Sequence, residues 1–173
     1  MYLAVVCYPD LVEGAREWIE DVRAQYAGLQ HDPLPPNMNL VYPVANIDST
    51  KLIEHVQYVV ESFKPFRFVV RCAIPVKDTL SPSTYVMLPP DEGFSAVVFL
   101  HDALYSGLLA EHLSDDAPFI PHVAVGYTDD TDYARRIVDD INGVEFEMEG
   151  MVRTLDILHI GDDDISTISR IEL

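Results

Sequence analysis

The feature that most constrains the fold of this 173-residue chain is a repeated order of expected elements. Short β-like segments separate longer stretches in which apolar residues recur at spacings of three and four, which is typical of amphipathic helices. In order, the chain reads strand, helix, strand, helix, strand, strand, and then the same series again. The sequence therefore predicts an approximate internal duplication and two similar lobes.

The series consists of eight expected strands and four expected helices. The expected strands cover residues 2–8, 37–44, 66–74, 84–88, 94–100, 122–127, 144–160 and 165–172. The expected helices cover residues 11–27, 48–63, 101–113 and 130–141. Their predicted N-caps are Asp10, Asp48 or Ser49, and Asp130 or Thr131. We expect an α+β fold with two pseudo-symmetric lobes, each an antiparallel sheet with helices on its outer face, around a central groove. Residues 1–173 would form one two-lobed domain.

The formal net charge of −18 is the strongest compositional signal. It argues against binding to long nucleic acids, because each phosphate contact normally requires a Lys or Arg. Residues 1–110 carry a net charge of −6 and residues 111–173 one of −12, so an anion-binding site is expected in the first part. The simpler interpretation, which we prefer, is that the acidity forms a solvated surface, as also suits a saline cytoplasm.

The chain lacks signals for membranes, export and cofactors. No apolar run approaches the roughly 20 residues of a membrane-spanning helix, and the amino terminus lacks the basic start and cleavage site of a secretory signal. We expect a cytoplasmic protein without a membrane partner. Cys7 and Cys72 lie in apolar runs and are predicted to be buried, unpaired thiols. No metal-ligand cluster, P-loop or dinucleotide turn is present, so neither a metal nor a cofactor is expected. The oligomeric state stays open.

Two proline-introduced strands occupy corresponding places in the two halves and form the predicted site. They read P-N-M-N-L-V-Y-P at 36–43 and P-H-V-A-V-G-Y at 121–127. Side chains alternate across a strand. One face would therefore hold Asn37, Asn39, Val41, His122, Ala124 and Gly126. The opposite face would be core, with Met38, Leu40, Tyr42, Val123, Val125 and Tyr127. The first face would then line the groove between the lobes.

These two segments make the chain resemble the 2H phosphoesterases, which include the bacterial 2′-5′ RNA ligase-like proteins and the cyclic nucleotide phosphodiesterases. The resemblance spans nearly the whole chain. In that family each lobe contributes a His-x-Thr or His-x-Ser motif, usually after a proline and often followed by L-V-F-P in the first lobe. Here Asn37 and Asn39 stand where the first His and Thr would be, and Ala124 stands where the second Thr would be. Of the four functional positions, only His122 matches.

The resemblance implies chemistry on a cyclic phosphate, in which one group takes a proton from water and another donates one to the leaving oxygen. His122 is the candidate catalytic acid or base; the alternative is a histidine that serves only packing or solvation. Asn37 can orient a ligand but cannot relay a proton, and Asn39 could offer an amide donor to a phosphate oxygen. Ala124 lacks the hydroxyl that the family uses there. We therefore expect weak or lost catalysis.

Arg71 is the candidate anion-binding residue. On the expected strand 66–74 it shares a face with Arg67, and a guanidinium there could bind a phosphate with two hydrogen bonds. If both arginines face the groove, the groove should be less negative than the rest of the surface. The alternative interpretation is that Arg71 pairs with nearby acids.

Three functions remain open on these grounds. The first is a phosphoesterase-like enzyme that acts on a small nucleotide or cyclic phosphate, with His122 as catalytic residue and Asn37, Asn39 and Arg71 as substrate-binding residues. The second is a module on the same scaffold that binds such a ligand without turnover. The third is a structural or partner-binding protein.

Overall fold

The computed structural model describes all residues except 1, 115, 117 and 163. The helices are α1 (Ala15–Gln25), α2 (Ser49–Val60), α3 (Phe94–Leu104) and α4 (Thr131–Asn142), with a 3₁₀ turn at Gly107–His112. The strands are β1 (Tyr2–Cys7), β2 (Asp10–Leu11), β3 (Met38–Ala45), β4 (Phe66–Val70), β5 (Ile74–Lys77), β6 (Thr84–Leu88), β7 (Pro90–Glu92), β8 (Val123–Thr128), β9 (Met148–Val152), β10 (Thr154–Ile160) and β11 (Ile165–Glu172).

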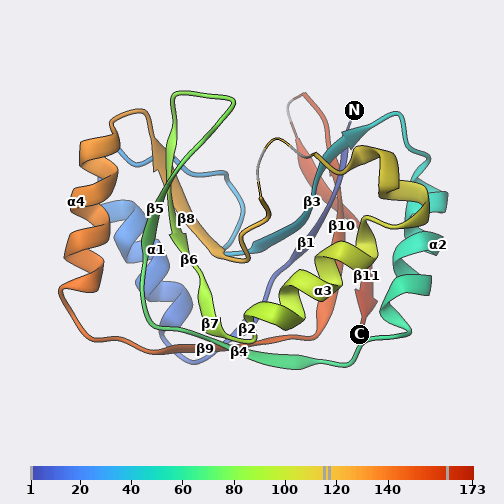
Figure 1. Cartoon of the computed structure of the whole chain (residues 1–173), viewed down its shortest axis with the longest axis horizontal. Coiled ribbons are helices and arrows are strands. Elements are labelled where there is room, and N and C mark those ends of the chain that lie inside the picture. The colour runs from blue at the N-terminus through green and yellow to red at the C-terminus, as the bar shows by residue number, and fades with distance from the viewer. Residues whose placement is uncertain (1, 115, 117, 163) are drawn as a thin grey trace.

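The strands form antiparallel sheets in two lobes, which confirms the predicted α+β class. One sheet has the order β11-β10-β1-β3 and another the order β5-β6-β8. Figure 1 shows these sheets on the right and left, with α2 outside the first and α1 and α4 outside the second. A third sheet, β2-β9-β4-β7, runs along the bottom of this view. Each of the two main sheets contributes one of the two candidate motif strands, β3 and β8.

Two of the predicted helices form as the sequence indicates. The buried positions of α2 are Leu52, Val56, Val59 and Val60, and those of α4 are Ala134, Ile137, Val138 and Ile141. This spacing places the apolar residues on one face against a sheet. Asp48 accepts a hydrogen bond from the Lys51 backbone N–H, and Asp130 from that of Tyr133, so both predicted aspartate caps are confirmed.

The prediction of a strand at 94–100 is wrong, because these residues begin helix α3. Its buried residues Val97, Leu100 and Leu104 recur at spacings of three and four. A short apolar run fits a buried strand and a buried helix equally well, and here the flanking Gly93, with φ of 82°, starts a helix. The helix predicted at 101–113 is the end of α3 followed by the 3₁₀ turn.

The start of the first helix also differs from the prediction. Asp10 and Leu11 form the short strand β2, which pairs with β9, so Asp10 does not cap α1. The helix begins after Gly14, whose φ of 82° places it in the left-handed region that favours glycine. Asp10 is instead paired with Arg153, at 3.1 Å.

The expected long strand 66–74 is two shorter strands, joined by Arg71, Cys72 and Ala73. β4 ends at Val70, and β5 begins at Ile74 and pairs with β6. Cys72 lies in this connection and is exposed, so its predicted burial is wrong. Cys7 is buried as predicted, and burial, with a smaller contribution from Asp156, raises the pKa of its thiol to about 12.

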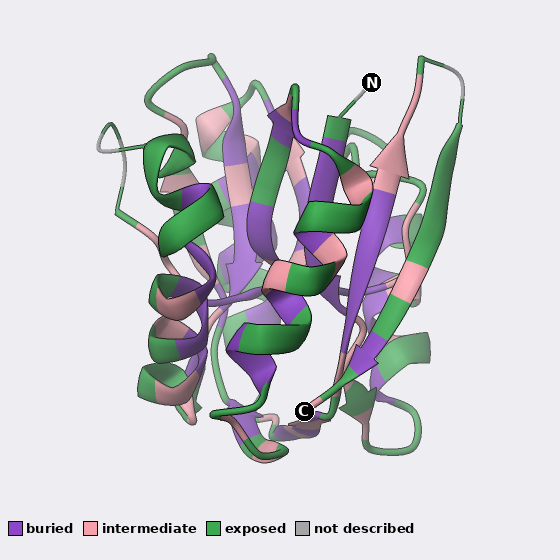
Figure 2. Ribbon diagram, turned by 90° about the vertical axis from the view of Figure 1, so that its right-hand side faces the viewer, coloured by how far each residue is buried: buried purple, intermediate pink, exposed green. Residues whose placement is uncertain are grey.

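One large core connects the lobes. It combines the helix-facing residues of both main sheets with those of the third sheet. Figure 2 shows buried residues along the central strands and exposed ones on the outer sides of the helices and along much of β11. The expectation of one two-lobed domain over residues 1–173 stays a prediction. Among the described residues, no helix is long and apolar enough to cross a membrane.

Candidate functional site

The two motif segments, 37–39 and 122–124, lie side by side although they are far apart in the sequence. The backbone N–H of Ala124 donates to the carbonyl of Asn37 at 3.1 Å, just where β3 and β8 begin. This contact brings the first-lobe motif against the second-lobe motif. The two segments that correspond in the sequence are therefore also neighbours in the structure.

Asn37 and His122 make the same local hydrogen bond. Asn37 Nδ2 donates to the carbonyl of Pro35 at 2.9 Å, and His122 Nδ1 lies 2.7 Å from the carbonyl of Ile120. In both cases the acceptor is two residues earlier in the chain. A carbonyl only accepts, so Nδ1 of His122 carries the proton and the Asn37 amide is oriented with Oδ1 away from Pro35. Asn37 thus keeps the bond of its histidine counterpart but offers no second ring nitrogen.

Both side chains are almost completely buried. Asn37 is 3% exposed and His122 is 7% exposed. That these nearly enclosed residues line the groove between the lobes stays a prediction. In the proline-bearing loop before Asn37, Leu34 packs on Ala4, Val6 and Leu158 of the first sheet.

The remaining polar atoms of the two residues make no hydrogen bond to the described residues. Asn37 Oδ1 is a buried side-chain atom without a partner there. His122 Nε2 likewise has no hydrogen-bond partner among the described residues, whereas Nδ1 of the same ring is bonded to Ile120. Burial lowers the pKa of His122, and the bond to Ile120 opposes this only in part. His122 is therefore neutral at pH 7, with Nε2 as an acceptor able to take a proton.

Asn39 faces away from the helices, as predicted. It pairs with Val6 of β1, and Val6 pairs with Asp156 of β10. Asp156 is fully buried and accepts hydrogen bonds from Nε and Nη2 of Arg170 on β11, with Nη2 2.9 Å from Oδ1. Asn39 is half-buried, and its side chain has no partner in the part of the chain that the structure describes. It is free to donate to a ligand oxygen.

A bulge in β8 changes the predicted face of the second motif strand. Met87 pairs with Ala124 but Val86 pairs with Gly126, so Val125 is an extra residue. Beyond the bulge the alternation is reversed, and Gly126 no longer shares the face of His122 and Ala124. A Cβ on Gly126 would instead meet Leu29.

The sequence predicts that Tyr127 and Tyr42 lie on the core face, but strand irregularities also turn them away from it. Tyr127 pairs with Tyr85, and their ring centroids are 5.5 Å apart. The β1–β3 register shifts twice, and Tyr42 beside one of these shifts is 48% exposed. Strict alternation holds only where neither strand bulges.

Arg71 is held by carboxylates rather than brought to the motif residues. Its Nε, Nη1 and Nη2 contact Glu147 at 2.7 Å, Asp91 at 2.9 Å and Glu92 at 2.6 Å. Arg67 pairs with Glu92 and Glu149 in the same exposed network on the third sheet. The structure favours the alternative interpretation of Arg71 as a partner of nearby acids. A phosphate would have to displace these carboxylates.

The residue that sequence reasoning missed is Arg23. Its side chain on α1 is 4% exposed and donates to the carbonyls of Val125, Ala124 and Leu34. The sequence could have indicated this burial by the position of Arg23. It is four residues after Ile19 and three before Tyr26, on the helix face that packs inward. Such a position is a sign of a buried arginine with backbone partners.

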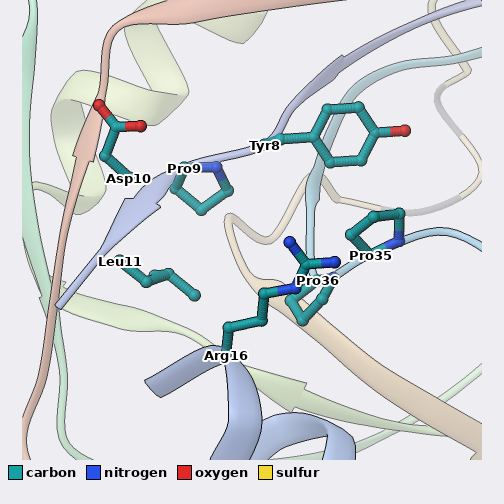
Figure 3. A pocket seen from close by; sticks show the side chains of 7 residues that line it. All are labelled: Tyr8, Pro9, Asp10, Leu11, Arg16, Pro35 and Pro36. Carbon is teal, nitrogen blue, oxygen red and sulfur yellow. The ribbon is translucent and has the colours of Figure 1, made fainter. Parts of the chain in front are cut away.

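Two cavities formed by the described residues lie beside the first motif segment. One of about 310 Å³ lies between Tyr8, Arg16 and the Pro35–Pro36 segment that precedes Asn37, as Figure 3 shows. Another is lined by Pro33, Leu34 and the β10–β11 hairpin. No group of three or more His, Cys, Asp and Glu residues in the described ranges is arranged to hold a metal ion.

Comparisons with known proteins agree with this geometry. The model of the 2′-5′ RNA ligase superfamily matches residues 11–164. The Thermus thermophilus protein TT0787 is similar over 100% of this chain and 98% of its own, with a TM-score of 0.68 and 14% identity. Escherichia coli LigT crystallised with ATP is similar over 99% and 97%, with a TM-score of 0.62 and 15% identity. LigT crystallised with 3′-AMP gives a TM-score of 0.59 at 16% identity, over 99% and 97%.

No curated protein matches the chain. At these identities the solved structures establish the fold alone, whereas the family model covers most of the sequence and includes both motif segments. The chain belongs to the 2′-5′ RNA ligase superfamily, the 2H phosphoesterases.

Proposed function

We propose that this protein recognises a small nucleotide or cyclic phosphate at the motif segments of β3 and β8, and that it hydrolyses 2′,3′-cyclic phosphates slowly or not at all. One observation carries the proposal: Asn37 and His122 make the same bond to a preceding carbonyl, but only His122 has a second ring nitrogen. The location that fits such ligands is the cytoplasm.

The proposed roles follow from the atoms that each residue leaves available. His122 Nε2 is an acceptor and could take a proton from water as a general base. Asn39 could donate its amide to a phosphate oxygen, while Asn37 could only orient the ligand. Opening the ring also requires an acid for the leaving oxygen, and Asn37 cannot supply that proton. Arg71 has no part in the proposal, because its guanidinium is already paired.

Two observations support a small nucleotide as the ligand: the ligands of LigT and the charge of this chain. LigT, which shares the fold, has been crystallised with ATP and with 3′-AMP. A small ligand also suits the charge of this chain, since a single phosphate requires few donors whereas a long polymer requires many cations.

Restoring the family motif tests the proposal. A triple variant that combines Asn37→His, Asn39→Thr and Ala124→Thr should hydrolyse 2′,3′-cyclic AMP, which chromatography of the products would measure. Loss of one proton carrier typically lowers a rate by about 10²–10⁴, so the gain should be of that order. His122→Ala in the restored protein is the control and should abolish the gain. Wild-type turnover that matches the restored protein would show that another residue carries the second proton.

A second candidate is a ligand-binding module without catalysis on the same scaffold. It is favoured by Asn37, whose amide cannot relay a proton, and by the near-complete burial of Asn37 and His122. This second function would be supported if calorimetry shows that the protein binds 3′-AMP while the restored protein does not hydrolyse 2′,3′-cyclic AMP. Absence of any nucleotide binding would leave the partner-binding alternative.

A further inference from the structure

A buried guanidinium lies behind both motif segments. Arg23 projects from α1, and each of its nitrogens has a partner. Nε donates to the carbonyl of Val125 at 2.9 Å, and Nη2 to that of Ala124 at 3.0 Å. Nη1 donates to the carbonyl of Leu34 at 3.1 Å and lies 3.4 Å from Glu20. Three of these four partners are backbone carbonyls, and two of them, those of Ala124 and Val125, lie 101 and 102 residues further along the chain.

The carbonyls belong to the parts of the chain that fix the two motif residues. Ala124 and Val125 form the bulge of β8, next to His122. Leu34 is followed by Pro35, whose carbonyl accepts the side-chain bond of Asn37. The N–H of Ala124 also donates to the carbonyl of Asn37. Arg23 therefore holds the second motif segment and the loop that anchors the first at the same time.

We infer that Arg23 is a positioning residue, which sets the separation and orientation of Asn37 and His122. The inference deepens the proposed function and depends on it, because it matters only if these two residues meet a ligand. The planar fork of an arginine suits this task, since it presents donors in fixed directions to several carbonyls at once. A lysine has a single ammonium and cannot span all of them.

The energetics argue against a role in filling space alone. Burial lowers the pKa of Arg23, which reflects the unfavourable removal of its charge from water, while Glu20 acts in the opposite direction. An apolar side chain could occupy this space without that penalty. It would leave the carbonyls at the bulge without donors, however, and such carbonyls drive local rearrangement of the strand.

The test uses the full chain with Arg23→Met, Arg23→Lys and the control Arg135→Met, which removes an exposed arginine from α4. Two quantities are measured: the NMR resonances of the His122 ring and the Ala124 amide without ligand, and the Kd for 3′-AMP. We expect Arg23→Met to shift both resonances and weaken 3′-AMP binding at least about tenfold. Arg23→Lys should give a smaller change in each, and Arg135→Met should leave both unchanged.

The outcomes separate the inference from the proposed function. If wild-type protein does not bind 3′-AMP, the proposed function fails, and the resonances of His122 and Ala124 alone decide the role of Arg23. If Arg23→Met lowers thermal stability but keeps the wild-type resonances and Kd, the inference is overturned. It is also overturned if neither Arg23 variant folds, because Arg23 would then serve the fold as a whole.

Discussion

At the scale of single residues, the site is defined by how two side chains use their polar atoms. Asn37 and His122 both satisfy a carbonyl two residues earlier, but Asn37 leaves a buried acceptor and His122 leaves a basic ring nitrogen, neither with a partner among the described residues. A buried acceptor without a partner costs about 1–3 kcal/mol. The first motif position thus carries a cost in stability at the place where the family has a proton carrier.

The buried histidines should make stability depend on pH. Burial lowers the pKa of both His122 and His101. In the unfolded chain these groups take up protons near the ordinary value of about 6.5, whereas in the folded protein they resist protonation. Stability should therefore be constant above that pH and fall as the pH drops below it, by at most about 1.4 kcal/mol per pH unit for each histidine.

Urea unfolding between pH 7.5 and 5 measures this dependence. His122→Asn should reduce the slope, and His101→Asn combined with it should remove most of the slope. His112→Asn, at an exposed position, should leave the slope as in the wild type. A wild-type free energy of unfolding that does not change over this range would contradict the prediction.

At the scale of elements, strand irregularities decide which residues share a face. The bulge in β8 reverses the alternation after Ala124, and the two register shifts between β1 and β3, one at Tyr42 and one at Leu40, disturb it in β3. Gln30 exchanges backbone hydrogen bonds with Tyr127 beyond the bulge, so the loop before the first motif attaches to the second motif strand. The bulge is therefore part of how the two motif segments are joined.

Substitution Gly126→Ala tests this connection. The new Cβ would lie 2.8 Å from Leu29 Cγ and would also collide with the carbonyl of Gln30. We expect a loss of about 1–3 kcal/mol in the free energy of unfolding, because the backbone must move to relieve the overlap. The Tyr127 amide should exchange its hydrogen faster. Thr167→Ala, exposed on β11, is the control and should change stability by less than about 0.5 kcal/mol. Unchanged stability of Gly126→Ala would mean that the loop can shift without cost.

At the scale of the whole molecule, the net charge of −18 is the dominant property. Much of the positive charge is already paired, as in the network of Arg67 and Arg71 with carboxylates of the third sheet. Exposed ion pairs of this kind contribute little each. The excess of acids therefore acts mainly as self-repulsion, which destabilises the compact state.

Salt should stabilise the protein, because it screens this repulsion over a distance that shortens from about 30 Å at 0.01 M to about 3 Å at 1 M. We expect the Tm at pH 7.5 to rise between 0.01 and 0.5 M NaCl in a calorimetric series. The rise should be smaller at pH 5, nearer the sequence pI of about 4.4. A Tm that falls with salt would show that the ion pairs outweigh the repulsion.

The sequence by itself determined the class of fold, and it predicted which two segments form the candidate site. Helices α2 and α4 could be predicted because apolar spacing and an aspartate cap act within a few residues. The motif segments at 37–39 and 122–124 could be aligned with each other because a proline precedes each of them. Only the tertiary structure decided that 94–100 is helical, that Gly126 leaves the motif face, and that Arg71 is paired while Arg23 is buried. These outcomes depend on which distant segments supply the partners of a backbone or side-chain group, and no local pattern contains that information.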